Sequence, residues 1–249
     1  MVQLVNFTEL YEQTKSMLTE SGKAAGKLEL VSTDLKTARK YAEKVFSYNA
    51  KDLDEEIPDF DTNYKIAQKQ AKLGFTQRKD MPVISNKDVK KLQQRLTSGE
   101  IDIKAPYGKD TKSSDPFPQG LKGEAATKFL KGGIKIKDGD EKDDVVKVTQ
   151  GVEEVGKLKP IQKQIYFDKS MDKTVPFGVE GTQKFLQSKN NFYITSADNY
   201  IIDGHHRYLQ GVLIDPKMKV PVIKIDLPLS KLLPMTLAYA DSIGNERNK

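Results

Sequence analysis

Apolar residues recur at helical spacing in four stretches of the first hundred residues, and each stretch has residues that start or stop helices at its ends. Asp34 and Ser85 are good N-cap residues, whereas Gly22, Gly74 and Gly99 follow the last apolar positions. The pattern predicts a helical domain over residues 1–103, whose apolar stripes pack together or, alternatively, form a groove that docks a partner. The predicted helices cover residues 7–18, 35–46, 62–73 and 85–96.

The apolar period is lost after residue 103. Pro, Gly, Ser and Asp dominate residues 104–122, which predicts a linker, with a functional lid as the alternative. A short helix at 124–130 and alternating strands at 134–137 and 145–149 are expected next. We therefore treat residues 104–145 as a linker with short elements.

Short β-prone runs and helical patterns alternate in residues 146–249. The runs Phe192–Thr195 and Tyr200–Ile202 flank a good hairpin turn, and a helix that follows them ends at Asp215-Pro216. A strand is predicted at 219–225, near a sheet edge because of Pro221. Further helices are predicted at 179–188 and 229–243. The fold class is therefore α+β, with a small mixed α/β domain after the helical one.

Composition restricts the possible functions. The chain has no cysteine, which excludes disulfides, thiol catalysis and thiolate metal sites. There is no apolar run of about 18 residues, so no membrane-spanning helix is expected. The start of the chain lacks the features of a signal peptide, so a cytoplasmic location is expected, in the host if the protein is phage-encoded. A net charge of +6 permits contact with DNA, although lysines and acids are interleaved.

Both histidines of the protein stand side by side in the stretch Tyr200-Ile-Ile-Asp-Gly-His-His-Arg-Tyr208. A strand here ends on an Asp-Gly turn and leads into a helix, whose first N–H groups favour anions. Arg207 offers a fixed set of donors for phosphate oxygens, and Gly204 lets the backbone approach a ligand closely. The stretch therefore predicts an anion-binding corner.

The same stretch offers groups for catalysis. Asp203 can act as a base, orient an imidazole or hold Mg²⁺ beside phosphates. His205 and His206 point in different directions, so one can contact an anion while the other packs or relays a proton. Each residue also has an ordinary structural interpretation, such as a helix cap or a buried ring. Their concentration within a few positions favours a ligand-binding or catalytic role.

Three patterns in residues 150–228 resemble the ParB/sulfiredoxin superfamily. These are Leu158-Lys-Pro-Ile-Gln162, the hairpin that leads into Ile202–Tyr208, and the Val-Pro-Val-Ile strand that follows. The Asp-Gly-His-His-Arg form is most similar to the free serine kinase branch. The resemblance implies a nucleotide site for ATP or ADP, or for CTP, together with Mg²⁺.

The resemblance also implies roles for particular residues. His206 and Arg207 would contact phosphate, as would Thr182 and Lys184 on the helix before the hairpin. Gln162 would contact substrate or simply cap the end of a strand. The sulfiredoxin cysteine is replaced by His205, which excludes that chemistry. The glutamate expected in the serine kinase branch has three candidates, which are Glu153, Glu154 and Glu180.

The expected function is a nucleotide-dependent phosphotransferase or NTP hydrolase, with Asp203 as base or metal ligand. One alternative is a ParB-like DNA-binding protein or nuclease. The other is a non-enzymatic accessory or inhibitor protein that keeps the fold as a binding module.

Overall fold

The computed structural model describes residues 26–101, 103 and 142–247. The elements predicted at 7–18, 124–130 and 134–137 lie outside these residues. The helices are α2 (Leu35–Ser47), α3 (Leu53–Glu56), α4 (Phe60–Ala71), α5 (Asn86–Thr97), α7 (Phe167–Thr174), α8 (Gly178–Gln187), α9 (His205–Ile214) and α10 (Leu229–Ser242). The strands are β1 (Val148–Glu154), β2 (Tyr193–Thr195), β3 (Ile201–Asp203) and β4 (Lys219–Ile225). The predicted α+β class is confirmed.

The strands form a four-stranded mixed sheet in the order β1-β4-β2-β3. β4 pairs antiparallel with β1 and parallel with β2, and the predicted hairpin of β2 and β3 is present. β4 lies beside the edge strand β1, so it is near an edge as predicted, although it is not itself an edge strand. Pro221 is tolerated inside the sheet because it lies opposite Val152 at a position of the β1–β4 ladder without hydrogen bonds, so its nitrogen points away from β1. On that other side β2 pairs with β4 only from Val222 onward, so no strand needs the missing N–H.

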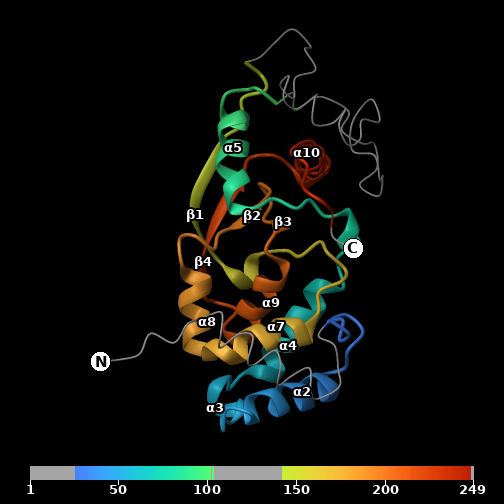
Figure 1. Cartoon of the computed structure of the whole chain (residues 1–249), viewed down its shortest axis with the longest axis vertical. Helices are drawn as coiled ribbons and strands as arrows, with labels where there is room; N and C mark the ends of the chain where they lie inside the picture. Colours follow the sequence, from blue (N-terminus) through green and yellow to red (C-terminus); the bar gives the residue numbers. More distant parts are fainter. Residues whose placement is uncertain (1–25, 102, 104–141, 248–249) are drawn as a thin grey trace, which may run out of the picture.

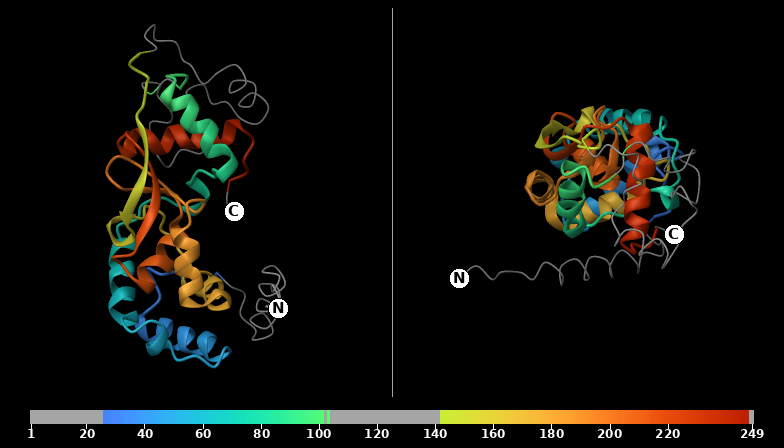
Figure 2. Two further views of the ribbon diagram at one scale, coloured as in Figure 1. Left: turned by 90° about the vertical axis from the view of Figure 1, so that its left-hand side faces the viewer. Right: turned by 90° about the horizontal axis from the view of Figure 1, so that it is seen from above.

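Both faces of the sheet are covered by helices, as expected when side chains of successive strand residues point to opposite faces. In Figure 1, α5 and α10 lie in the upper part of the molecule, whereas α2, α4, α7, α8 and α9 lie in the lower part. The turned view in Figure 2 keeps this division. Tyr193, Ile201 and Val222 belong to the core beneath the sheet with α9. Their neighbours Ile194, Ile202 and Ile223 belong to the core with α5 and α10.

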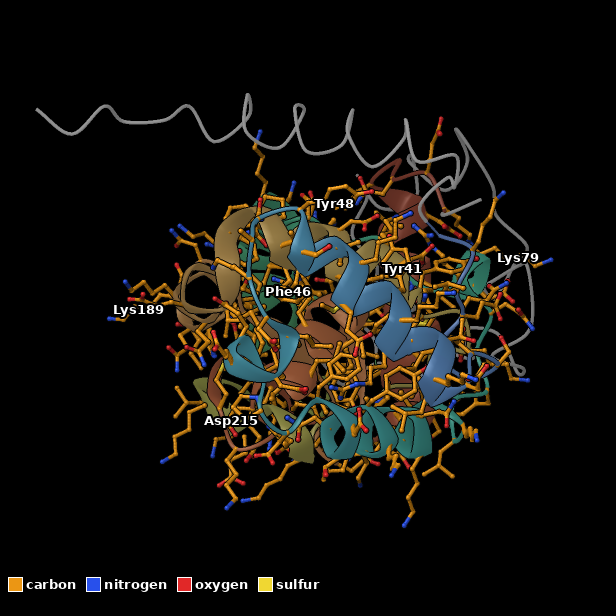
Figure 3. All side chains as sticks on the ribbon, turned by 90° about the horizontal axis from the view of Figure 1, so that it is seen from below. Tyr41, Phe46, Tyr48, Lys79, Lys189 and Asp215 are labelled. Atoms are coloured by element: carbon orange, nitrogen blue, oxygen red, sulfur yellow. The ribbon has the colours of Figure 1, made fainter. Side chains whose placement is uncertain are left out.

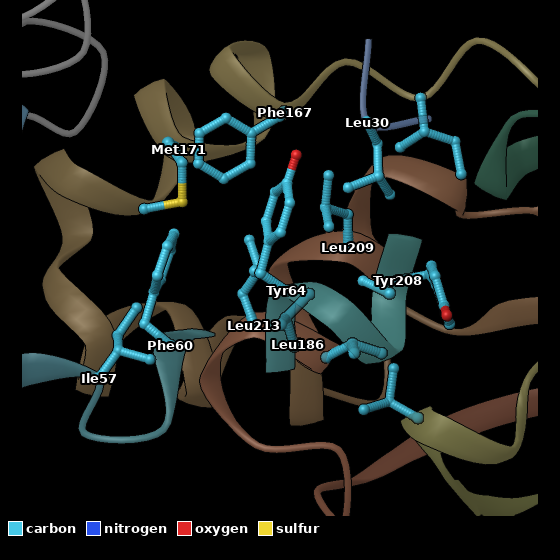
Figure 4. Close-up of a cluster of buried hydrophobic side chains, with 14 of the residues drawn as sticks. Leu30, Ile57, Phe60, Tyr64, Phe167, Met171, Leu186, Tyr208, Leu209 and Leu213 are labelled. Carbon is cyan, nitrogen blue, oxygen red and sulfur yellow. The ribbon is translucent and has the colours of Figure 1, made fainter. Parts of the chain in front are cut away.

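The larger core joins helices that are distant in sequence. Tyr64 of α4 meets Phe167 of α7 edge to face, with ring centroids 5.4 Å apart, and Leu209 of α9 lies beside them (Figure 4). The Tyr64 hydroxyl donates to the Thr33 carbonyl at 2.8 Å, which satisfies its only polar group. Burying aromatic side chains of this size contributes about 2–3 kcal/mol each. This packing fixes α7 and α9, the two helices that carry most of the site described below.

The helices of the first segment are distributed over both faces of the sheet. α2 lies across the lower end of the molecule, with Tyr48 at its C-terminus (Figure 3), and α2 and α4 pack under α7 and α9. α5 packs on the opposite face and begins at the predicted N-cap Ser85, which forms a capping box with Asp88. The division into domains at residues 103 and 146 stays a prediction, and within the described residues both cores combine side chains of the two segments.

Among the described residues, no helix is both long and apolar enough to cross a membrane.

Candidate anion-binding site

A pocket of about 450 Å³ opens where the β3–α9 turn meets α7, α8 and the residues around Arg78. This volume suits a small-molecule ligand. Seven of the eight predicted site residues line the pocket, and only Lys184 is missing from its walls. The lining residues are Arg78, Met81, Pro82, Gln162, Lys173, Phe177, Thr182, Phe185, Ile202, Asp203, Gly204, His205, His206, Arg207 and Gln210.

Gly204 makes the turn from β3 into α9 possible. Its backbone has φ +115°, a conformation that L side chains rarely adopt, and a Cβ atom there would lie 2.6 Å from Tyr193 Cδ1. The turn places His205, His206 and Arg207 in the first turn of α9, where backbone N–H groups lack helical partners. The first turn therefore contributes partial positive charge to the pocket.

His205 is buried and connects the turn to the Pro-Ile-Gln segment. Its Nε2 lies 3.2 Å from the backbone nitrogens of both Ile161 and Gln162, which donate to it. Burial, together with the neighbouring His206, lowers the pKa of His205 to about 3, so the ring is neutral near pH 7. Because Nε2 already accepts two N–H groups, this geometry favours a positioning role over the predicted proton relay.

His206 is also neutral, but for a partly different reason. Its Nε2 accepts a hydrogen bond from the Tyr166 N–H at 3.4 Å, and the two rings are stacked. Desolvation and, to a smaller extent, the positive charges of Lys169, Arg78 and Lys173 together lower the pKa of His206 to about 3. A neutral imidazole beside three cations indicates a strongly positive local potential.

Arg207 and Asp203 form an ion pair at the pocket wall. Arg207 Nη2 lies 2.7 Å from Asp203 Oδ2, and the guanidinium sits over the Tyr193 ring at 5.3 Å. Desolvation raises the pKa of Asp203 although Arg207 opposes this effect. The stacked, paired guanidinium is held in place, which preorganises it for a planar oxyanion.

Arg78 and Lys173 add two further cations to the lining. Among the described residues neither has an ion-pair partner within 4.0 Å, although the Arg78 guanidinium lies over the Tyr166 ring at 5.8 Å. Desolvation lowers the pKa of Lys173, and Arg207 and Arg78 lower it further. Cations that depress one another in this way are energetically unfavourable unless an anion lies between them.

The remaining predicted residues differ in how they reach the pocket. Thr182 lines it, but its hydroxyl donates to the Gly178 carbonyl at 2.8 Å. Gln162 lines it, with its amide nitrogen bonded to the Gln164 carbonyl. Lys184 points away from it and pairs with Glu180 at 2.5 Å on the surface.

None of the three glutamates considered from the sequence lines the pocket. Glu153 lies near Lys224, Glu154 pairs with Lys157, and Glu180 pairs with Lys184. Among the residues that the structure describes, Asp203 is the only carboxylate in the lining. Among the described residues there is no group of three or more His, Asp or Glu side chains that could hold a metal ion. One carboxylate already paired with Arg207 is a poor donor set for Mg²⁺.

Sequence reasoning missed four residues that matter to this pocket. Lys173 lies on α7, a helix that the sequence did not predict. Arg78 is an ordinary basic residue in a short 3₁₀ turn, Arg78–Asp80, and no local pattern distinguishes it. Phe177 and Phe185 stack at 6.2 Å with an interplanar angle of 20°, and Phe185 is 43% exposed. The spacing of Phe177 and Phe185 around α8 is the one sequence signal that could have pointed to this partly exposed stacked pair beside the cations.

No protein-family model matches the chain, and neither curated proteins nor solved structures give a match.

Proposed function

We propose that the pocket binds the phosphate groups of a nucleotide and that the protein is a nucleotide-dependent phosphotransferase or NTP hydrolase. The observation that carries the proposal is the excess of positive charge in the lining, where Arg78, Lys173 and Arg207 face a single carboxylate, Asp203. The first turn of α9 adds backbone N–H donors, which are suited to phosphate oxygens. Transfer of a phosphoryl group depends mainly on positioning and on neutralising its charge.

The chain supplies groups for each part of such a reaction. Arg78, Lys173 and Arg207 would neutralise the phosphates. Asp203, whose pKa is raised, would accept the proton of an acceptor hydroxyl or water while that oxygen bonds to the terminal phosphorus and the bond to the leaving diphosphate breaks. In this proposal arginine and lysine side chains neutralise the phosphate charge, because the described residues of the pocket do not offer the oxygen ligands that a protein-held Mg²⁺ needs.

The aromatic pair extends the proposal to the base. Phe177 and Phe185 belong to the same pocket as the cations, and the exposed part of Phe185 offers a flat apolar surface. Stacking of a base on an aromatic ring tolerates different bases, so ATP, ADP and CTP all remain candidates. As part of the same proposal, the protein acts in the cytoplasm, where nucleoside triphosphates are available.

Calorimetric titration with ATP, ADP, CTP, adenosine and pyrophosphate tests the proposal. Nucleotides and pyrophosphate should bind and adenosine should not, and Arg78→Gln should weaken binding about tenfold or more, as expected for a lost charged hydrogen bond. Lys184→Gln, which removes a lysine outside the pocket, is the matched control. Phosphorus NMR of the same mixtures with an added acceptor reports turnover.

Each outcome has a distinct meaning. Binding without turnover in any mixture would reject the enzyme and leave a binding module. Absence of binding by a folded protein would reject the proposal. Affinity for duplex DNA that falls steeply with salt and does not change in Arg78→Gln would favour the DNA-binding alternative.

A further inference from the structure

β1 forms one edge of the sheet, since β4 alone pairs with it among the described strands. It runs along the outer side of the molecule in both Figure 1 and Figure 2. The strand is seven residues long, and the side chains from Thr149 to Val152 are exposed on both of its faces. Long exposed edges template pairing with another strand, and proteins normally protect them with proline, a bulge or charges along the strand. β1 has no proline, its pairing with β4 runs without a register shift, and its charges, Glu153 and Glu154, stand only at its C-terminal end.

The ladder with β4 determines which backbone groups of β1 face outward. The Lys147 carbonyl accepts from the Asp226 N–H, and the Val155 N–H donates to the Met218 carbonyl, both at 2.9 Å. In an antiparallel ladder each residue turns its N–H and C=O to one side, and the side alternates along the strand. The odd-numbered residues from 147 to 155 therefore bond to β4. The even-numbered residues direct their backbone groups outward; these are Val148, Gln150, Val152 and Glu154.

We propose that β1 pairs antiparallel with β1 of a second copy of this chain, with Gln150 on the two-fold axis. Outward-facing residues must then lie opposite outward-facing residues, which allows register shifts only in steps of two. In the proposed register Val148 lies opposite Val152 of the second copy. Val152 is 66% exposed in the single chain, so pairing removes apolar surface from water.

Charge complementarity selects this register. Lys147 lies opposite Glu153 of the second copy, and symmetry repeats the pair, which gives two cross-strand pairs of opposite charge. In the next allowed register in either direction, the residue opposite Lys147 shifts by two positions, from Glu153 to Val155 or to Gly151. Both charge pairs are then lost. Lys147 is exposed and Glu153 is partly exposed. The Glu153 carboxylate contacts Lys224 at 3.9 Å, the Asn199 side-chain amide at 3.5 Å and the Glu154 N–H at 3.2 Å, and a lysine opposite it on a second copy would replace the long contact with Lys224.

Light scattering after size exclusion, with the full chain over a wide concentration range, tests the proposal. The wild type should move from 28.0 kDa toward twice that mass as concentration rises. Lys147→Glu and Glu153→Lys should each stay at the single-chain mass, because each places like charges opposite one another at two positions. An equimolar mixture of the two variants should associate again, because every cross-strand pair then joins opposite charges.

Lys189→Glu, an equal charge change on the exposed segment after α8, should leave association unchanged. Restored mass in the mixture cannot arise from misfolding of either variant, so it identifies this register. A wild type that stays at the single-chain mass at every concentration overturns the proposal. So does a Lys147→Glu variant that associates as the wild type does.

Discussion

The Nε2 atom of His205 accepts a hydrogen bond from the backbone nitrogen of Gln162, 3.2 Å away and 43 positions earlier in the chain. The Ile161 N–H donates to the same atom. One imidazole therefore holds the Pro-Ile-Gln segment against the first turn of α9. Two of the three patterns that suggested a nucleotide-binding superfamily are thus in direct contact.

Replacing His205 with alanine should destabilise the protein strongly. Two buried backbone N–H groups would lose their acceptor and a cavity would remain, so the free energy of unfolding should fall by about 2–4 kcal/mol. His205→Gln places an amide oxygen near the position of Nε2 and should recover part of the loss. Urea denaturation of the three proteins measures the difference. Equal stability of the wild type and His205→Ala would show that this hydrogen bond does not hold the segment.

Stability should rise with pH in the acidic range. Both histidines have folded pKa values of about 3 and unfolded values near 6.5, so the unfolded state binds two more protons between these limits. Asp172 acts in the opposite direction, since desolvation raises its folded pKa to about 6. Asp203, whose folded pKa is also raised by desolvation, acts in the same direction as Asp172. The slope between about pH 4 and 6 should therefore stay below the limit of about 2.7 kcal/mol per pH unit that two protons would give.

The contribution of Asp172 can be separated by substitution. Asp172→Asn keeps an oxygen that can accept the Tyr41 hydroxyl, which lies 2.5 Å from Asp172 Oδ1, but cannot titrate. The pH dependence of its unfolding free energy should become steeper between pH 4 and 6, because one of the groups that oppose the histidines no longer titrates. An unchanged slope would mean that Asp172 titrates normally in the folded protein.

Most helices and strands could be predicted from the sequence, but the way they pack against one another could not. Capping residues located α2 and α5, and the Asp-Asn turn located the hairpin, because these signals are local. α7 was missed because its eight residues carry few apolar positions. Arg78 and Lys173 could not be assigned to the site, since their convergence on His206 depends on tertiary packing. The placement of β4 inside the sheet likewise depends on the length of β2, a property of a different segment.

Gly204→Ala should cost more than Gly26→Ala, although both glycines have positive φ. At Gly26, with φ +99°, an added Cβ would meet open space, so only backbone strain of about 1–2 kcal/mol is expected. At Gly204 the Cβ would also collide with the buried Tyr193 ring, which raises the loss to about 2–4 kcal/mol. Thermal or urea unfolding compares the two variants. Equal losses would mean that the Tyr193 ring can move aside.

Phe185→Ala should separate recognition of the base from recognition of phosphate. If the ring stacks on a base, the variant loses about 1–3 kcal/mol of ATP or CTP affinity, whereas pyrophosphate affinity stays the same. Phe185 is partly exposed, so little stability should be lost. Calorimetry with both ligands provides the comparison. Parallel losses for nucleotide and pyrophosphate would argue that Phe185 shapes the pocket and does not contact the base.

Lys173→Met should have opposite effects on stability and on binding. Without an anion, Lys173 is repelled by Arg207 and Arg78, so removing its charge should raise the free energy of unfolding. The gain should be small, because the side chain is exposed and water screens the repulsion. The same change should weaken pyrophosphate binding about tenfold or more, because a charged contact is lost. Lys184→Met, outside the pocket and paired with Glu180, should leave binding unchanged. General structural damage lowers stability and affinity together, so a rise in one with a fall in the other is specific to an anion site. A Lys173→Met variant with lower stability and unchanged affinity would show that the cluster of cations does not serve to bind phosphate.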